Sequence, residues 1–347
     1  MEADAEPPSS ASSLSSMKTM NDSKPCAPPA DSTSVLTSPY TPSDWSRTSP
    51  RQSPLLNRPP NPRVYQVWPQ VGGNNQFLCR GRCVTGPKID LWYNCCAWSC
   101  ILVLPGLYFC ICGPRVYKIH WVLPAAAALF LLATIICLLL TSCTDPGIIP
   151  RHALQVAVND LEREVASATS APPMAVDAVT SEPVCVLTQE QDELGYRWCP
   201  TCKVVRPPRA SHCRDCDNCV MRFDHHCPFV NNCVGSRNYA FFSAFLLSVA
   251  CLCFTVILGV ILFIMGESHI SNVVLIMICG VIVVPAAFLV VVVMGLALFH
   301  VWLCCRGKTT REALTGKVTL AGRTLFRFRG PSLIHTRDRV TLPMRII

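Results

Sequence analysis

Four long uncharged blocks alternate with polar segments along the chain. The blocks cover residues 91–112, 121–143, 241–265 and 273–303, and none of them contains Asp, Glu, Lys or Arg. Each block has at least about 20 residues, which is enough for a helix to cross a hydrocarbon core of roughly 30 Å. The pattern therefore predicts an α-helical integral membrane protein with four transmembrane helices. Asn94 and Pro105 make the first block the weakest, and the long fourth block is expected to cross from about Ile282 onward.

The polar segments predict what lies between and around these helices. Residues 1–60 are rich in Ser, Pro and Thr, which is typical of a disordered tail. Residues 144–196 are expected to form a cytosolic linker with one short surface helix at 153–168. The other predicted parts are a membrane-proximal basic and aromatic segment (61–90), a helix hairpin (91–143) with a tight turn at 113–120, a Cys-rich domain (197–240), a second helix pair (241–303) and a basic tail (304–347).

The distribution of Lys and Arg predicts the orientation of the chain. These residues gather before residue 91, between residues 144 and 240, and after residue 303, whereas residues 113–120 hold two and residues 266–272 hold none. Because positively charged loops stay on the cytosolic side, both termini and the Cys-rich domain are expected in the cytosol. The formal net charge of +8 suits a surface near anionic lipid, and no motif for binding nucleic acid accompanies it.

Seven cysteines and three histidines crowd into the short stretch 199–233. They are Cys199, Cys202, His212, Cys213, Cys216, Cys219, His225, His226, Cys227 and Cys233. In a reducing cytosol such a cluster favours metal binding or catalysis over disulfides, and a small domain with little core needs such cross-links. A structural zinc takes four ligands, so two zincs would use eight of the ten and leave one Cys and one His. Spacing alone does not assign the ligands, because adjacent side chains point in different directions.

The run from Asp224 to Cys227 suggests a use for the two remaining residues. A carboxylate can orient an imidazole, which can lower the pKa of a nearby thiol and accept its proton, and the thiolate is the nucleophile. The same residues are equally consistent with a structural role, in which Asp224 orients a ligating His and Cys227 binds metal. The spacing leaves both alternatives open.

The order of these residues resembles the DHHC-type protein S-acyltransferases (palmitoyltransferases). The resemblance covers the Cys-rich domain, the layout of four membrane helices, and short motifs after the second and fourth helices, or about two-thirds of the chain. The matching motifs are Cys199-x2-Cys202, Arg206-Pro207-x-Arg209, His212-Cys213-x2-Cys216-x2-Cys219, Asp224-His225-His226-Cys227-Pro228, Asn232-Cys233-x-Gly235, Asn238, Asp145-Pro146-Gly147 and Thr309-Thr310-x-Glu312.

The resemblance implies a ligand set for each of two structural Zn²⁺ ions. One ion would be held by Cys199, Cys202, His212 and Cys219, and the other by Cys213, Cys216, His226 and Cys233. The remaining pair is His225 and Cys227, which implies a Cys227 nucleophile, a His225 base and an Asp224 that fixes the tautomer of His225.

The resemblance also implies the reaction and the partners. Cys227 would take a long-chain acyl group, such as palmitoyl, from acyl-CoA and pass it to cysteines of cytosolic or membrane-associated proteins. Membrane lipid is a further partner, the family sometimes requires an accessory subunit, and no nucleic acid is expected. The membrane would be that of the Golgi, the endoplasmic reticulum or the cell surface.

Several residues near this core carry weaker expectations. Phe229 stands where the family usually has Trp, which keeps an apolar ring but loses an N–H donor. Thr309, Thr310 and Glu312 either cap a helix or brace the active site. The juxtamembrane pair Cys304-Cys305 is either acylated or unmodified. His300 is expected to be a residue of a helix end rather than a catalyst.

Three other functions compete with acyl transfer. A membrane-anchored zinc module, such as a RING-like ubiquitin ligase or a scaffold, would have no additional nucleophile. A transporter or channel would need ionisable groups in its pathway, and the four blocks have no Asp, Glu, Lys or Arg. A family member without activity would act as a regulator, and the complete Asp224-His225-His226-Cys227 run argues against it.

Overall fold

The computed structural model describes residues 62–158, 160–171, 175–176, 183–185, 187–266, 270–316 and 332–334. Within these residues, four helices are long and apolar enough to cross a membrane, namely Lys88–Ile111, Val122–Cys143, Tyr239–Gly266 and Asn272–Arg306. They confirm the prediction of four transmembrane helices with a Cys-rich region between the second and the third. The expected N-terminal tail and most of the basic C-terminal tail lie outside the described residues.

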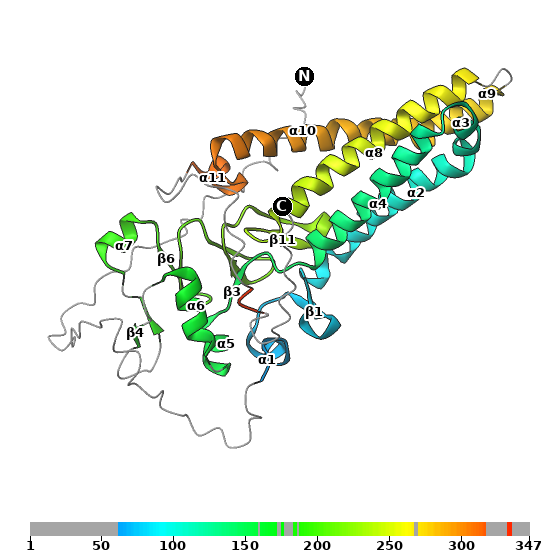
Figure 1. Ribbon diagram of the computed structural model, residues 1–347. Helices are drawn as coiled ribbons and strands as arrows, with labels where there is room; N and C mark the ends of the chain where they lie inside the picture. Colours follow the sequence, from blue (N-terminus) through cyan, green and yellow to red (C-terminus); the bar gives the residue numbers. More distant parts are fainter. Residues whose placement is uncertain are drawn as a thin grey trace, which may run out of the picture. The chain divides into compact units, whose positions relative to one another are not determined.

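The membrane helices pack around the third one (Figure 1). Helix α8 (Tyr239–Gly266) contacts both α4 (Val122–Cys143) and α10 (Val284–Arg306), while α2 (Leu91–Ile111) continues from the short 3-10 helix η3 (Lys88–Asp90). The fourth span runs through α9 (Asn272–Ile278), the π-helical stretch η5 (Cys279–Val283) and α10. Pro285 lies in the first turn of α10 and cannot donate a backbone hydrogen bond, which accounts for a local change of helix type at this point.

The first two spans are joined by a helix instead of the expected tight turn. Residues Gly113–Ile119 form α3, which has a proline in its first turn, where a missing N–H costs nothing. Helix α2 approaches α8 closely at Gly259, where an added Cβ would lie 2.3 Å from the hydroxyl oxygen of Tyr108. Small residues allow this close approach of membrane helices.

The Cys-rich region is built from short antiparallel hairpins. β6 (Arg197–Cys199) pairs with β7 (Val204–Arg206), and β10 (His225–Cys227) pairs with β11 (Asn232–Val234). A three-stranded sheet has the order β3 (Ile148–Ile149), β9 (Asn218–Val220) and β8 (Ser211–Cys213). The remaining strand pairs are β1 (Gln76–Leu78) with β2 (Cys83–Thr85), and β4 (Ala175–Val176) with β5 (Pro183–Val184).

Segments from outside the Cys-rich region complete its core. Trp68 of α1 (Val64–Val71) and Val84 of β2 are buried against it, although the 61–90 segment was expected only to lead into the membrane. The prediction of a single surface helix at 153–168 is wrong. The segment forms α5 (His152–Ala157) and α6 (Leu161–Thr169), separated by a left-handed residue at Asp160, and Leu154 and Val165 are buried in the same core. The other short helices are η2 (Cys79–Gly81), α7 (Gln189–Glu193), η4 (Pro228–Val230) and α11 (Thr310–Thr315).

Two buried asparagines fix the Cys-rich domain to the end of α4. The side-chain amide of Asn232 donates to the carbonyl oxygens of Ser142 and Thr144, each at 3.0 Å. The amide of Asn238 donates to the carbonyl oxygen of Thr141 at 3.1 Å, and its own oxygen accepts from the N–H of Gly235 at 2.9 Å. The last turn of a helix leaves carbonyls without intrahelical partners, so these amides satisfy groups that burial would otherwise penalise.

Candidate functional site: two metal clusters and a Cys–His pair

The first candidate ligand cluster brings together the turn between β6 and β7 and the middle residues of β8 and β9. It consists of Cys199, Cys202, His212 and Cys219, whose ligand atoms all lie within 4.8 Å of one another. The Nδ1 atom of His212 lies 3.7, 3.4 and 3.8 Å from the sulfurs of Cys199, Cys202 and Cys219. The Cys199–Cys202 turn forms a knuckle in which the N–H of Cys202 points at the sulfur of Cys199.

The second cluster repeats this design with residues from β8, β10 and β11. It consists of Cys213, Cys216, His226 and Cys233, again with ligand atoms within 4.8 Å of one another. The Nδ1 atom of His226 lies 3.4 Å from the sulfur of Cys216 and 3.5 Å from that of Cys233. The structure thus brings together both sets of four residues that the sequence resemblance implied.

The donor sets fit tetrahedral metal ions. Zinc at about 2.3 Å from sulfur and about 2.0–2.1 Å from nitrogen places neighbouring ligand atoms roughly 3.5–3.8 Å apart, close to the separations here. Hydrogen bonds to Cys213 and Cys216, followed by burial, raise the pKa of Cys233 well above its usual value of 9.0. Several buried thiols side by side cannot all ionise without a cation between them, so the clusters are able to hold metal ions.

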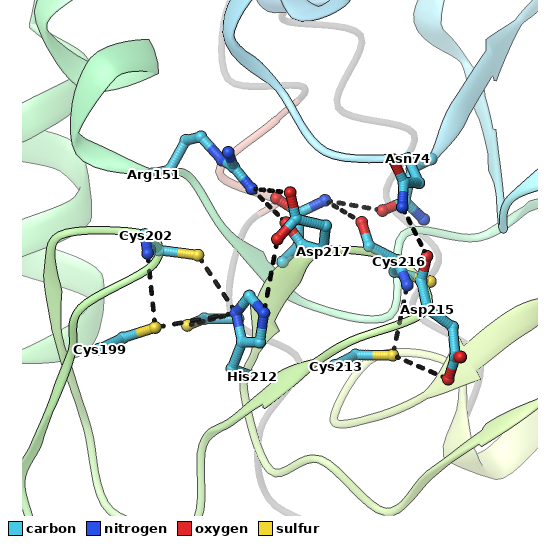
Figure 2. A network of polar contacts seen from close by, with 12 residues as sticks. Asn74, Arg151, Cys199, Cys202, His212, Cys213, Asp215, Cys216 and Asp217 are labelled. Carbon is cyan, nitrogen blue, oxygen red and sulfur yellow. Dashed lines mark hydrogen bonds and ion pairs between the residues drawn. The ribbon is translucent and has the colours of Figure 1, made fainter. Parts of the chain in front are cut away.

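The histidine of each cluster is backed by a carboxylate that the sequence alone did not single out. The Nε2 atom of His226 lies 2.8 Å from Asp90 at the start of the first membrane helix. The Nε2 atom of His212 lies 3.5 Å from Asp217, which also forms an ion pair with Arg151 at 2.8 Å (Figure 2). Such carboxylates fix the ring orientation and leave Nδ1 facing the cluster.

The third arrangement is formed by the two residues that the clusters leave over. His225 and Cys227 lie on β10, two positions apart, so their side chains share one face of the strand. The Nδ1 atom of His225 lies 2.7 Å from the carboxylate of Asp224, whose side chain is almost fully buried. The thiol of Cys227 lies beside His225 and near the backbone N–H groups of Phe229 and Val230, and all three favour its thiolate form.

These contacts shift the pKa values of all three groups. Burial disfavours the charged forms, but hydrogen bonds and charge within the arrangement outweigh it. Burial raises the pKa values of Asp224 and Cys227, but the hydrogen bonding and charge of His225 outweigh it, so the pKa of Asp224 lies below 3.8 and that of the Cys227 thiol below 9.0. Despite its burial, His225 has a pKa raised to about 9 by Asp224 and Cys227. Thiolate and imidazolium therefore stabilise each other.

The segment after the fourth membrane helix supports Asp224. The N–H and hydroxyl of Thr310 donate to this carboxylate at 2.8 and 2.7 Å. Thr309 and Glu312 form the capping box of α11, so the segment caps a helix and, through Thr310, also braces Asp224. Glu312 also forms a buried two-pronged ion pair with Arg209, at 2.6 and 2.7 Å.

Cys227 also packs at the edge of a hydrophobic cluster to which all four membrane helices contribute. Its cluster includes Trp98 and Ile101 of α2, Leu138 of α4, Phe242 and Leu246 of α8, and Val293 and Ala297 of α10. Phe229 is 54% exposed beside it and packs edge-to-face on Tyr93 of α2, with ring centroids 6.0 Å apart. The thiol therefore lies where the polar domain meets the apolar helices.

His300 has closer links to the site than its position near a helix end suggested. It is buried on α10, its ring centroid is 6.0 Å from that of His225, and its Nδ1 lies 2.9 Å from the hydroxyl oxygen of Tyr239. The same hydroxyl lies 3.6 Å from the sulfur of Cys304, so one of the two juxtamembrane cysteines faces this polar group. The sequence offered no spacing signal for His300, because it lies 75 residues beyond His225.

Comparisons with known proteins agree with this geometry. The DHHC palmitoyltransferase family model matches residues 192–317. Palmitoyltransferase ZDHHC14 of Homo sapiens is 36% identical over 280 residues, which cover 78% of this chain and 55% of the relative, so the chain spans about half the length of that protein. Palmitoyltransferase ZDHHC18-B of Danio rerio is 34% identical over 290 residues, covering 80% of this chain and 69% of the relative.

A plant protein shows the same likeness. The probable protein S-acyltransferase 2 of Arabidopsis thaliana is 34% identical over 269 residues, covering 72% of this chain and 61% of the relative. The matched stretches are long enough to include the membrane helices as well as the Cys-rich domain. The chain belongs to the DHHC palmitoyltransferase family.

Proposed function

We propose that the chain is a protein S-palmitoyltransferase that moves a long-chain acyl group from acyl-CoA, through a thioester on Cys227, to cysteines of proteins at the cytosolic membrane surface. One observation carries the proposal. The Cys227 thiol lies beside His225, which lowers its pKa, and at the edge of a hydrophobic cluster to which all four membrane helices contribute. A nucleophile in this position suits a substrate with a polar thioester and a long apolar chain.

In the first step, Cys227 attacks the thioester carbonyl of acyl-CoA. His225 takes up the thiol proton and stabilises the thiolate, and Asp224 holds His225 with Nε2 directed at the sulfur. A bond forms between the Cys227 sulfur and the acyl carbon, the bond to the CoA sulfur breaks, and CoA leaves as a thiol after receiving the proton. The backbone N–H groups of Phe229 and Val230 lie beside the reacting sulfur, where they could also meet the developing oxyanion.

In the second step, the thiol of a substrate protein attacks the acyl-enzyme. His225 accepts the proton of that thiol, the acyl group moves to the new sulfur, and the proton passes to the sulfur of Cys227 as it leaves. His225 is the base in both steps, and the acyl carbonyl occupies the same position in both, as expected of a double-displacement reaction. The acceptor protein needs only a cysteine that can reach the membrane surface.

The apolar cluster beside Cys227 suits the acyl chain. Each CH₂ group gains about 0.8 kcal/mol on leaving water, so an acyl chain of palmitoyl length must stay in an apolar environment throughout the reaction. The cluster contains residues of α2, α4, α8 and α10 and continues from the thiol into the helix bundle. Membrane lipid is then the surrounding partner, and CoA remains on the polar side.

Two Zn²⁺ ions have structural roles in this account. Cys199, Cys202, His212 and Cys219 would hold one ion, and Cys213, Cys216, His226 and Cys233 the other. With four protein ligands, each ion would lack an open position, and it would supply cross-linking energy to a domain of short hairpins. Cys227, His225 and Asp224 perform the chemistry.

The Cys-rich domain and both termini would face the cytosol, where acyl-CoA and the acceptor proteins occur. This follows from the gathering of Lys and Arg on one side of the four spans. The membrane would be that of the Golgi, the endoplasmic reticulum or the cell surface, and an accessory subunit is a further expected partner of the family.

The proposal is tested with the full chain in membranes or detergent, palmitoyl-CoA and a short acceptor peptide that contains one cysteine. We expect the wild type to release CoA and acylate the peptide, and Cys227→Ser to do neither while it retains two zinc ions. A Cys227→Ser protein with less zinc than the wild type would make Cys227 a ligand. Equal acyl transfer by both proteins would show that Cys227 is not the nucleophile. A membrane-anchored zinc module would then explain the chain better.

A further inference from the structure

Cys83 and Cys143 form a thiol pair that takes part neither in the two metal clusters nor in the Cys–His arrangement. Cys83 is the first residue of β2, and Cys143 is the last residue of α4, at the boundary of the second membrane span. Their side chains interact where β2 packs against the end of α4. Both residues are partly exposed, so a small reagent can reach them.

The backbone around the two cysteines is held together by a single amide group. The Nδ2 atom of Asn232 donates to the carbonyl oxygen of Val84, beside Cys83, at 3.0 Å. The same nitrogen donates to the carbonyl oxygens of Ser142 and Thr144, which flank Cys143, each at 3.0 Å. Because one buried nitrogen contacts both segments, the two cysteines are kept close by the main chain and not only by their side-chain conformations.

We propose that Cys83 and Cys143 are a redox modification site, in which the two thiols form a reversible disulfide with each other by exchange with a low-molecular-weight disulfide such as oxidised glutathione. One protein thiolate attacks a sulfur of oxidised glutathione, and one glutathione thiolate leaves. The second protein thiol then attacks the mixed disulfide, and the other glutathione leaves and takes up the proton. One protein disulfide and two reduced glutathione molecules are formed, and excess dithiol reverses the reaction.

The position of the pair gives the disulfide a structural consequence. It would join the segment before the first membrane helix to the end of the second one, at the point that Asn232 already bridges. Asn232 is the cross-strand partner of Cys227 in the β10–β11 hairpin, and its side-chain oxygen accepts from the N–H of Cys233. Disulfides in a reducing compartment are usually transient and redox-sensing. This disulfide would form under oxidising conditions, next to the hairpin that carries Cys227. The inference does not depend on the transferase activity.

The experiment uses the full chain with Cys227→Ser and zinc bound, so that the nucleophile cannot react. The protein is treated with oxidised glutathione, unreacted thiols are blocked with N-ethylmaleimide, and peptides are mapped without reduction. We expect a cross-linked peptide that joins Cys83 to Cys143, the loss of Cys83 and Cys143 from the alkylatable thiols, and the return of both with dithiothreitol. Cys79→Ser is the matched control, because it removes an exposed thiol of the same hairpin and should leave the cross-link intact.

Two further results bear on the pairing. Cys83→Ser should convert the cross-link into a stable glutathione adduct on Cys143, with zinc content unchanged as the sign of a folded domain. The proposal is overturned if Cys83 joins Cys79 instead. It is also overturned if Cys83 and Cys143 both remain alkylatable, or carry separate glutathione adducts, while the exposed Cys305 shows that the oxidant has reacted.

Discussion

Thr310 donates two hydrogen bonds to the carboxylate of Asp224, one from its backbone N–H at 2.8 Å and one from its hydroxyl at 2.7 Å. The contact joins the segment after the last membrane helix to the acid that orients His225, 86 residues earlier in the chain. Because Asp224 is buried, its orientation depends on these donors and not on water. The proposed catalytic arrangement therefore includes Thr310, which acts on it through Asp224.

Thr310→Val keeps the backbone N–H and the branched shape but removes the hydroxyl. A hydrogen bond to a charged group contributes about 1.5–3 kcal/mol, so we expect the rate of Cys227 acylation to fall by on the order of tenfold. Thr315→Val is the matched control, because the Thr315 hydroxyl bonds only the local carbonyl of Arg311 at the exposed end of the same helix. An equal loss of acylation rate in both variants would show that the substitutions act by destabilising α11 and not through Asp224.

Glu312→Gln tests the buried ion pair with Arg209. The Glu312 carboxylate accepts from Arg209 at 2.6 and 2.7 Å, and the two side chains are 9% and 6% exposed. Breaking a buried pair leaves an uncompensated charge, which costs about 3–5 kcal/mol. We expect a lower melting temperature, which a double variant with apolar residues at both positions should partly restore. A melting temperature equal to that of the exposed-site control Glu190→Gln would contradict the prediction.

Asp90→Asn and Asp217→Asn probe the carboxylates behind the two histidine ligands. Loss of such a partner typically lowers metal affinity by about 10- to 100-fold. The Asp90 contact with His226 is 2.8 Å and the Asp217 contact with His212 is 3.5 Å, so we expect the larger loss for Asp90→Asn. Zinc release to a chromogenic chelator measures both, and unchanged release in Asp90→Asn would remove this carboxylate from the metal site.

The lowered pKa of the Cys227 thiol predicts the pH dependence of its alkylation. The thiolate is the reactive form, so the rate should titrate below pH 9.0, the usual pKa of a thiol. His225→Gln removes the imidazolium and leaves burial to oppose ionisation, so the same rise should move to higher pH. Peptide-resolved iodoacetamide labelling follows Cys227 itself, and superimposable pH profiles of the two proteins would show that His225 does not activate the thiol.

Much of this arrangement follows from local signals in the sequence. Uncharged blocks of about 20 residues predict membrane helices because a charge in the hydrocarbon core is costly, and the blocks agree with the observed spans. The four-residue ligand sets were implied by the family pattern, and the structure brings each set together. The roles of Cys227, His225 and Asp224 remain predictions until they are measured.

Other features depend on distant contacts and have no local signal. Asp90 was not recognised as a partner of His226, because 136 residues separate them and only the folded hairpins bring the carboxylate to the ring. The segment 153–168 looked like a surface helix, but burial of Leu154 and Val165 against the Cys-rich core divides it into two short helices. His300 enters the site through the packing of α10 on α8, which spacing along the sequence does not encode.

The central claim is that Cys227 carries the acyl group while the two clusters hold metal. The most direct measurement exposes the wild-type chain briefly to palmitoyl-CoA, locates the hydroxylamine-labile acyl group by peptide mass spectrometry, and counts zinc in the same sample. The account predicts a thioester on Cys227 and two zinc ions per chain. An acyl group found only on Cys304 or Cys305, or a Cys227 that is absent from the alkylatable thiols because it binds zinc, would contradict it.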